Sequence, residues 1–168
     1  LKFYRRRLEV YKQTRRVQVQ ILLDRISKPE SAEIFYVSFP LHAKGYQVQM
    51  QMGGVPFQPE RDLFPNTCRD YYPIDNQVCF SKGDSRLVLD CHDNALVELG
   101  EMNDGLKREQ VPDDLSTVYA TIYNNVWYCN WPGNENGVME FAFDLYGSET
   151  ETTAHAPEAY PVVSVERK

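Results

Sequence analysis

Two short stretches combine aromatic rings with hydrogen-bonding side chains, a combination suited to sugar recognition. One is Arg69-Asp70-Tyr71-Tyr72, and the other contains Trp127, which follows two asparagines. Aromatic faces can stack on sugar rings while Arg, Asp and Asn side chains form hydrogen bonds with hydroxyl groups. These five residues are the candidate carbohydrate-binding or cleft-rim residues. The alternatives are that the rings belong to the protein core, and that Arg69 and Asp70 form an ion pair that fixes a loop.

A catalytic constellation is not evident. Cys91-His92-Asp93 resembles a nucleophile, a base and an orienting acid. Neighbouring residues on a strand point to alternate faces, however, so these three cannot form a triad. Neither His42 nor His92 can be given a carboxylate partner from sequence. The abundant acidic residues single out no pair of the kind that glycosidases use. We therefore predict no catalytic residue in this chain.

The four cysteines do not indicate a metal site. They are Cys68, Cys79, Cys91 and Cys129, and no two of them form a Cys-x-x-Cys pair. Together with three scattered histidines, this spacing does not match zinc ligation. We predict no metal and no cofactor in this chain. The cysteines are interpreted as reduced and mostly as small core residues, which favours a cytoplasmic protein.

The charge distribution is uneven along the chain. The net charge is −6, but residues 1–28 carry +7 and the remaining residues carry −13. In the basic stretch, charged and apolar residues alternate as on a half-exposed strand. The acidic remainder would repel a polyphosphate, so nucleic acid is not an expected partner. No apolar run approaches the length of a membrane helix, and no membrane association is expected.

The dominant hydrophobic period is two, which indicates strands. Residues 5–11 and 15–23 predict a hairpin that turns at 12–14. The further predicted strands are 34–39, 46–52, 77–80, 86–90, 96–99, 117–127 and 138–146, and residues 162–165 are the candidate for a last strand. Between them, 53–73 has four prolines and many aromatic and charged residues, which favours an ordered, functional loop. Residues 148–161 form an irregular polar tail.

About ten strands in 168 residues predict one all-β domain, an antiparallel β-sandwich spanning 1–168. The chain begins at Leu1, already inside an alternating pattern, which suggests that it is a fragment of a longer protein.

An ordered series of motifs supports a family resemblance. Phe39-Pro40, Gly53-Gly54-Val55, Pro59-Glu60-Arg61-Asp62 and Cys68-Arg69-Asp70-Tyr71 are followed by Asp93-Asn94-Ala95-Leu96-Val97 and Asn124-Asn125-Val126-Trp127. The series resembles the C-terminal β-sandwich region of bacterial glycoside hydrolase family 38 proteins, which are α-mannosidase-like. The resemblance implies a galactose-mutarotase-like supersandwich. It also implies a parent retaining glycosidase whose separate catalytic barrel holds zinc and an aspartate nucleophile.

Three hypotheses follow. The leading one is a non-catalytic domain that packs on the catalytic barrel of the parent chain and shapes its carbohydrate cleft with loop 53–73. The second is an independent carbohydrate-binding module. The third is a small epimerase of the mutarotase type, which needs a histidine facing a carboxylate across a sheet. A homo-oligomer is compatible with each of them.

Overall fold

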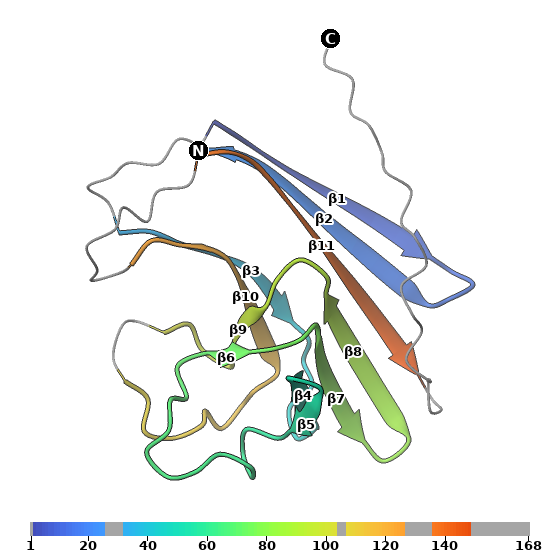
Figure 1. Ribbon diagram of the computed structural model, residues 1–168. Coiled ribbons are helices and arrows are strands. Elements are labelled where there is room, and N and C mark those ends of the chain that lie inside the picture. The colour runs from blue at the N-terminus through green and yellow to red at the C-terminus, as the bar shows by residue number, and fades with distance from the viewer. Residues whose placement is uncertain (1, 26–31, 104–106, 127–135, 149–168) are drawn as a thin grey trace.

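The computed structural model describes residues 2–25, 32–103, 107–126 and 136–148. In this part of the chain the fold is all-β, with eleven strands in two antiparallel sheets, as predicted (Figure 1). No helix long and apolar enough to cross a membrane occurs among these residues. The strands are β1 (Phe3–Tyr11), β2 (Arg16–Arg25), β3 (Ile34–Pro40), β4 (Gln47–Met52), β5 (Val55–Phe57), β6 (Tyr72–Pro73), β7 (Gln77–Lys82), β8 (Ser85–Cys91), β9 (Leu96–Leu99), β10 (Thr117–Asn124) and β11 (Gly137–Ser148).

The larger sheet has seven strands in the order β1-β2-β11-β8-β7-β4-β5. Its topology depends on β11, which pairs with β2 on one side and with β8 on the other. The last described strand therefore joins the N-terminal hairpin to the middle of the chain. The smaller sheet has the order β3-β10-β9-β6.

The core lies between the two sheets because apolar residues alternate with polar ones along most strands. Phe143 of β11 meets Phe39 of β3 with ring centroids 5.1 Å apart, and both side chains are buried. Ile21 and Leu89 add to this inner face of the larger sheet and are fully buried. Their sequence neighbours point to the opposite face, which is called the outer face below.

Two sequence predictions need correction. Residues 53–73 are not a continuous loop, because Val55–Phe57 pairs with β4 and Tyr72–Pro73 pairs with β9. The β4–β5 hairpin turns at Gly53-Gly54, where both residues have positive φ and both amides donate to the Asp75 carboxylate over 2.8 Å. The strand predicted for 117–127 ends at Asn124. The strand predicted for 162–165 and the tail at 149–161 lie outside the described residues.

The cysteine prediction holds for one residue of three. Cys91 is fully buried, and this burial raises the pKa of its thiol to about 12. Cys68 is exposed and Cys79 is half-buried, so neither is a core residue. All three are free thiols. Cys129 lies outside the described residues.

Candidate polar site on the outer face of the larger sheet

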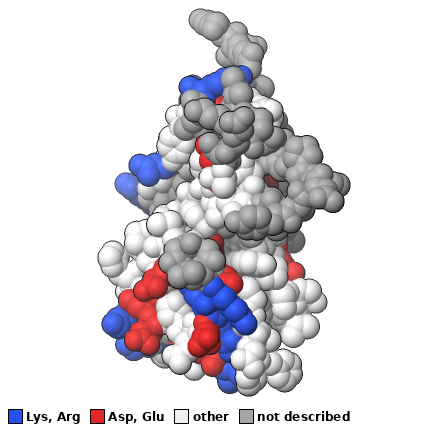
Figure 2. All heavy atoms as spheres, turned by 90° about the vertical axis from the view of Figure 1, so that its left-hand side faces the viewer, with Lys and Arg blue, Asp and Glu red and all other residues white. Residues whose placement is uncertain are grey.

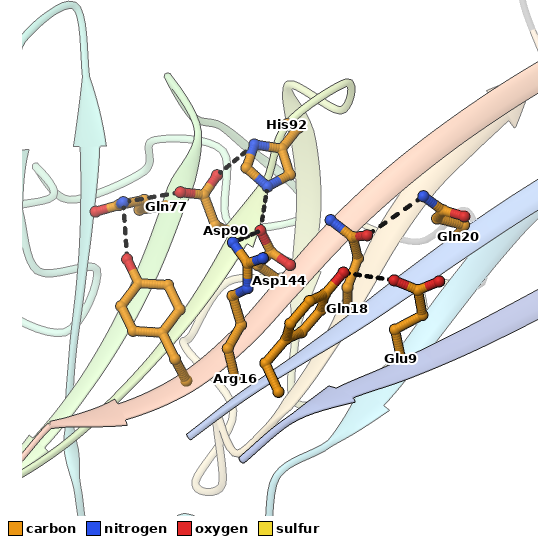
Figure 3. Close-up of polar contacts among 10 residues, drawn as sticks. Glu9, Arg16, Gln18, Gln20, Gln77, Asp90, His92 and Asp144 are labelled. Atoms are coloured by element: carbon orange, nitrogen blue, oxygen red, sulfur yellow. Dashed lines mark hydrogen bonds and ion pairs between the residues drawn. The ribbon is translucent and has the colours of Figure 1, made fainter. Parts of the chain in front are cut away.

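The register of the larger sheet aligns polar side chains across five neighbouring strands. Glu9 of β1 pairs with Gln18 of β2, and Gln18 pairs with Asp144 of β11. Asp144 pairs with Asp90 of β8, which pairs with Gln77 of β7. Because directly paired residues project to the same face of a sheet, these five side chains form one line on the outer face. We call this line the polar row (Figure 3).

His92 lies between the two aspartates of the polar row. Its Nε2 is 2.9 Å from Asp144 Oδ2, and its Nδ1 is 3.4 Å from Asp90 Oδ1. The hydrogen bond to Asp144 raises the pKa of His92, and the charges of both aspartates act in the same direction against the effect of burial. The geometry therefore stabilises an imidazolium that bridges β8 and β11.

Arginine and tyrosine side chains border the polar row. Arg16 Nη1 is 3.5 Å from Asp144 Oδ2, and the Arg16 guanidinium lies 4.4 Å from the centre of the Tyr11 ring. On the other side, Gln77 Nε2 donates to Asp90 Oδ2 over 3.0 Å and to the Tyr146 hydroxyl over 3.2 Å. These contacts hold the side chains in fixed positions relative to one another.

The His92 cluster tests the epimerase hypothesis. His92 does face carboxylates across the sheet. Sequence alone cannot identify these partners, because they depend on the register between β8 and β11. However, each ring nitrogen is directed at a carboxylate oxygen. A general acid or base must direct its proton or lone pair at the substrate. The observed arrangement suits a structural ion pair more than proton transfer to a sugar.

Cys91 and His92 point to opposite faces, as the sequence predicted, and Asp93 lies beyond the end of β8. The Cys91 side chain lies in the core, whereas His92 lies on the outer face. Asp93 Oδ2 accepts a hydrogen bond of 2.9 Å from the Ala142 amide. The three residues thus serve three different parts of the structure.

Four of the five predicted sugar-contacting residues lie on the loop before β6 and at its start. Arg69 donates to the carbonyls of Thr67 and Phe64 over 3.0 and 3.3 Å. Asp70 accepts hydrogen bonds from the Arg108 amide over 2.6 Å and from the Cys68 thiol over 3.6 Å. Arg69 and Asp70 therefore each fix the loop, but they do so through separate partners instead of the ion pair considered above.

The two tyrosines of this loop differ in exposure. Tyr71 is 49% exposed and remains available for contact with a ligand or a neighbouring domain. Tyr72 is 2% exposed and packs against Phe57, so it is a core residue, as one alternative held. Burial also raises the pKa of Tyr72. Trp127 lies outside the described residues.

A shallow cavity of about 230 Å³ lies beside this loop. Figure 2 shows acidic and basic side chains side by side over the lower half of the face that carries the loop. The residues lining the cavity are polar or charged: Asn66, Thr67, Lys107, Arg108, Glu109 and Gln110. No described residue of the polar row contributes to this cavity. Within the described ranges, no group of three or more His, Cys, Asp or Glu side chains is arranged to hold a metal ion.

Sequence reasoning missed the polar row. Glu9 alternates with exposed apolar residues and the other four members with core residues, so each one separately indicates only a solvent-facing position. A signal was present in the repeated Gln of Arg16–Gln20 and in Asp90 and Asp144, which interrupt apolar runs. The chain matches no family model, and comparisons with curated proteins and with solved structures gave no match.

Proposed function

We propose that this chain is a non-catalytic β-sandwich domain of a glycoside hydrolase that resembles the family 38 α-mannosidases. In this proposal the domain packs on the catalytic barrel of the parent chain, and the zinc and the nucleophile belong to that barrel. Loop residues Arg69, Asp70 and Tyr71 would lie at the rim of the carbohydrate cleft. The motif series supports the family, and an uncovered apolar surface supports the docking.

The observation that carries the docking is the inner side of β1. Tyr4, Leu8 and Val10 are 53%, 56% and 70% exposed. Their pairing partners on β2 include the core residues Leu23 and Val19. These three side chains, which we call the β1 patch, thus continue the face that is buried elsewhere in the sheet. Figure 1 shows that β1 lies away from β3 and β10, so the smaller sheet does not cover it.

An exposed apolar patch that continues a core face is typical of an interface with another domain. Arg6 lies between Tyr4 and Leu8 on the same side of β1, because it pairs with the core residue Ile21. Such a surface suits a partner whose apolar area includes an acidic group, because a desolvated arginine needs a carboxylate partner. The catalytic barrel of the parent chain is the partner that we propose.

The first test is enzymatic. The purified chain is expected to show no hydrolysis of an aryl α-mannoside, with or without added zinc. Hydrolysis by the isolated chain, lost when the chain is denatured, would contradict a non-catalytic role.

The second test examines docking directly. The reading frame is expected to extend upstream by several hundred residues and to encode a His-x-Asp zinc motif. That upstream polypeptide and this chain, expressed separately and mixed, are expected to co-elute in size-exclusion chromatography. Leu8→Asp and Val10→Asp should abolish co-elution, whereas Met102→Asp is the control, because Met102 is similarly exposed at 57% but lies in the loop after β9. Co-elution that survives both β1 substitutions would contradict docking through this strand.

A second candidate function is a carbohydrate-binding module that works without the barrel. The polar row favours it, since the row offers both donors and acceptors on one face of the sheet. This function predicts that the isolated chain binds sugars and that its binding does not depend on the β1 patch.

A further inference from the structure

The outer face of the larger sheet presents polar side chains over a long distance. The polar row crosses five strands, and neighbouring strands are about 4.8 Å apart, so it spans about 19 Å. On the next strand, Gln49 pairs with Cys79 of β7 and therefore projects to the same face. Gln47, Gln49 and Gln51 of β4 are all exposed. The polar surface is therefore elongated at right angles to the strands.

The chemistry of this surface suits hydroxyl groups. Gln20 and Gln77 carry both an amide donor and an acceptor, Arg16 carries only donors, and the aspartates accept. A sugar hydroxyl donates one hydrogen bond and accepts others, so a mixed set of this kind can satisfy several hydroxyls together. A cluster of only carboxylates would not offer this.

The charges on this surface are largely balanced. Glu9 forms an ion pair with Arg7, and Asp144 faces both Arg16 and His92. Because the pKa of His92 is raised, its charge offsets part of the charge of Asp90 and Asp144. A surface with paired charges has little attraction for a phosphate or a polyanion, and it favours a neutral ligand.

The surface is also held in place before any ligand binds. Gln20 Nε2 donates to Gln18 Oε1 over 3.3 Å, and Gln77 is fixed by its bonds to Asp90 and Tyr146. Gln18 and Asp144 are 4% and 3% exposed and form the base of the row. The partly exposed side chains above them, Gln20 and Gln77 among them, remain accessible. Less side-chain entropy is lost on binding when the contacting groups are already ordered.

From these observations we infer that the outer face of the larger sheet binds a neutral, extended polysaccharide that lies along the polar row, across the strands. This inference rests on the carbohydrate-related function proposed above and assigns the binding site to the sheet instead of to the loop before β6. The partly exposed residues Tyr11, Arg16, Gln20, Gln77 and His92 would contact the sugar.

Affinity gel electrophoresis of the whole chain tests this inference. The gels contain soluble α-mannan, galactomannan or mixed-linkage β-glucan, and a heparin gel serves as the anionic comparison. The chain is expected to be retarded by at least one of the neutral polysaccharides. Gln20→Ala and Gln77→Ala should each weaken that retardation at least threefold, and the double variant should abolish it.

Two control substitutions locate the site. Gln110→Ala removes a glutamine of the shallow cavity, and Met102→Ala removes an exposed side chain of the loop after β9. Both should leave retardation unchanged. Loss of retardation in Met102→Ala, retained retardation in the double variant, retardation only by heparin, or no retardation by any neutral polysaccharide would each overturn the inference.

Folding and docking are separated from binding in the same experiment. Thermal unfolding of each variant shows whether it is folded. If Gln77→Ala is not folded, Gln20→Ala and Gln49→Ala replace it in the binding experiment. Neither Gln20 nor Gln49 contacts Asp90, unlike Gln77. The Leu8→Asp variant should still bind polysaccharide. If the chain co-elutes with the barrel but binds no polysaccharide, the binding inference is wrong and the docking proposal stands. If it binds polysaccharide but does not co-elute, the docking proposal is wrong and the binding inference stands.

Discussion

The guanidinium of Arg25 lies 3.5 Å from the centre of the Tyr123 ring, and the Arg25 side chain is 1% exposed. Arg25 ends β2 in the larger sheet, whereas Tyr123 belongs to β10 in the smaller one. The same guanidinium forms an ion pair of 2.7 Å with Glu33 and lies 5.1 Å from the centre of the Phe35 ring. One buried cation therefore ties the two sheets together at this end of the sandwich.

Arg25→Lys is expected to lower the free energy of unfolding by about 2 kcal/mol, because the compact ammonium cannot reproduce the stacking of a planar guanidinium on Tyr123. Arg25→Ala should cost more, about 3–5 kcal/mol, because it also leaves Glu33 without its partner. Urea denaturation followed by fluorescence measures both values. If Arg25→Lys were as stable as the original chain, the stacking would have no energetic role.

Stability is expected to fall as the pH rises above neutrality. The pKa of His92 is raised from its usual value of 6.5 by Asp144 and Asp90. The folded state thus holds the proton more tightly than the unfolded state does. This contribution is complete below pH 6.5 and is lost as the pH rises through the folded-state pKa.

The measurement for His92 is the midpoint of thermal unfolding between pH 6 and pH 9. His92→Gln keeps a polar side chain but cannot titrate, so its midpoint should change less with pH over this range. Equal pH dependence in both proteins would show that His92 does not contribute.

Tyr36→Phe is expected to destabilise the smaller sheet by about 1–3 kcal/mol. The Tyr36 hydroxyl donates to Glu98 Oε1 over 2.6 Å, and Glu98 is 5% exposed. Among the described residues, the buried carboxylate then keeps the hydrogen bond from the Asn103 amide, which donates to its other oxygen over 2.6 Å. Tyr119→Phe, on the same face of the sheet, serves as the matched control in chemical denaturation. A larger loss in the control would contradict this account.

Gly100→Ala is expected to cost about 1–3 kcal/mol. Gly100 follows β9 with a φ of 78°, a conformation that side chains disfavour. A Cβ there would also overlap the Asp114 carbonyl oxygen and lie 2.9 Å from Pro112 Cβ. Gly83→Ala has a similar φ of 56° but meets no atom within 4 Å, so it isolates the backbone contribution. Equal losses for both variants would show that crowding at Gly100 has no effect.

The strands were predictable from sequence, whereas their order was not. Alternation along Gln47–Met52 is enough to indicate a strand, since the period of two is a local property. The short strand Val55–Phe57 was missed because Pro56 and the neighbouring prolines favour a loop. It forms at the edge of the sheet, where a proline needs no ladder partner on its outer side.

The candidate site could not be predicted either, because it depends on which strands pair and in which register. Asp90 and Asp144 are adjacent only because β8 pairs with β11 in one particular register. A shift of one residue would have placed Asp144 beside core residues instead. Sequence alone reports the side chains of a single strand, so it favoured residues that are neighbours in the chain, such as Arg69 to Tyr72.

The position of β11 has a consequence for biosynthesis. Gly137–Ser148 lies between the N-terminal hairpin and β8 and pairs with both. The larger sheet therefore cannot be completed until these late residues have left the ribosome. Until then the apolar sides of β2 and β8 have no neighbour between them, and the nascent protein is exposed to aggregation. Pairings between such distant segments also slow folding. A chain truncated after residue 136 should therefore depend on chaperones for its solubility.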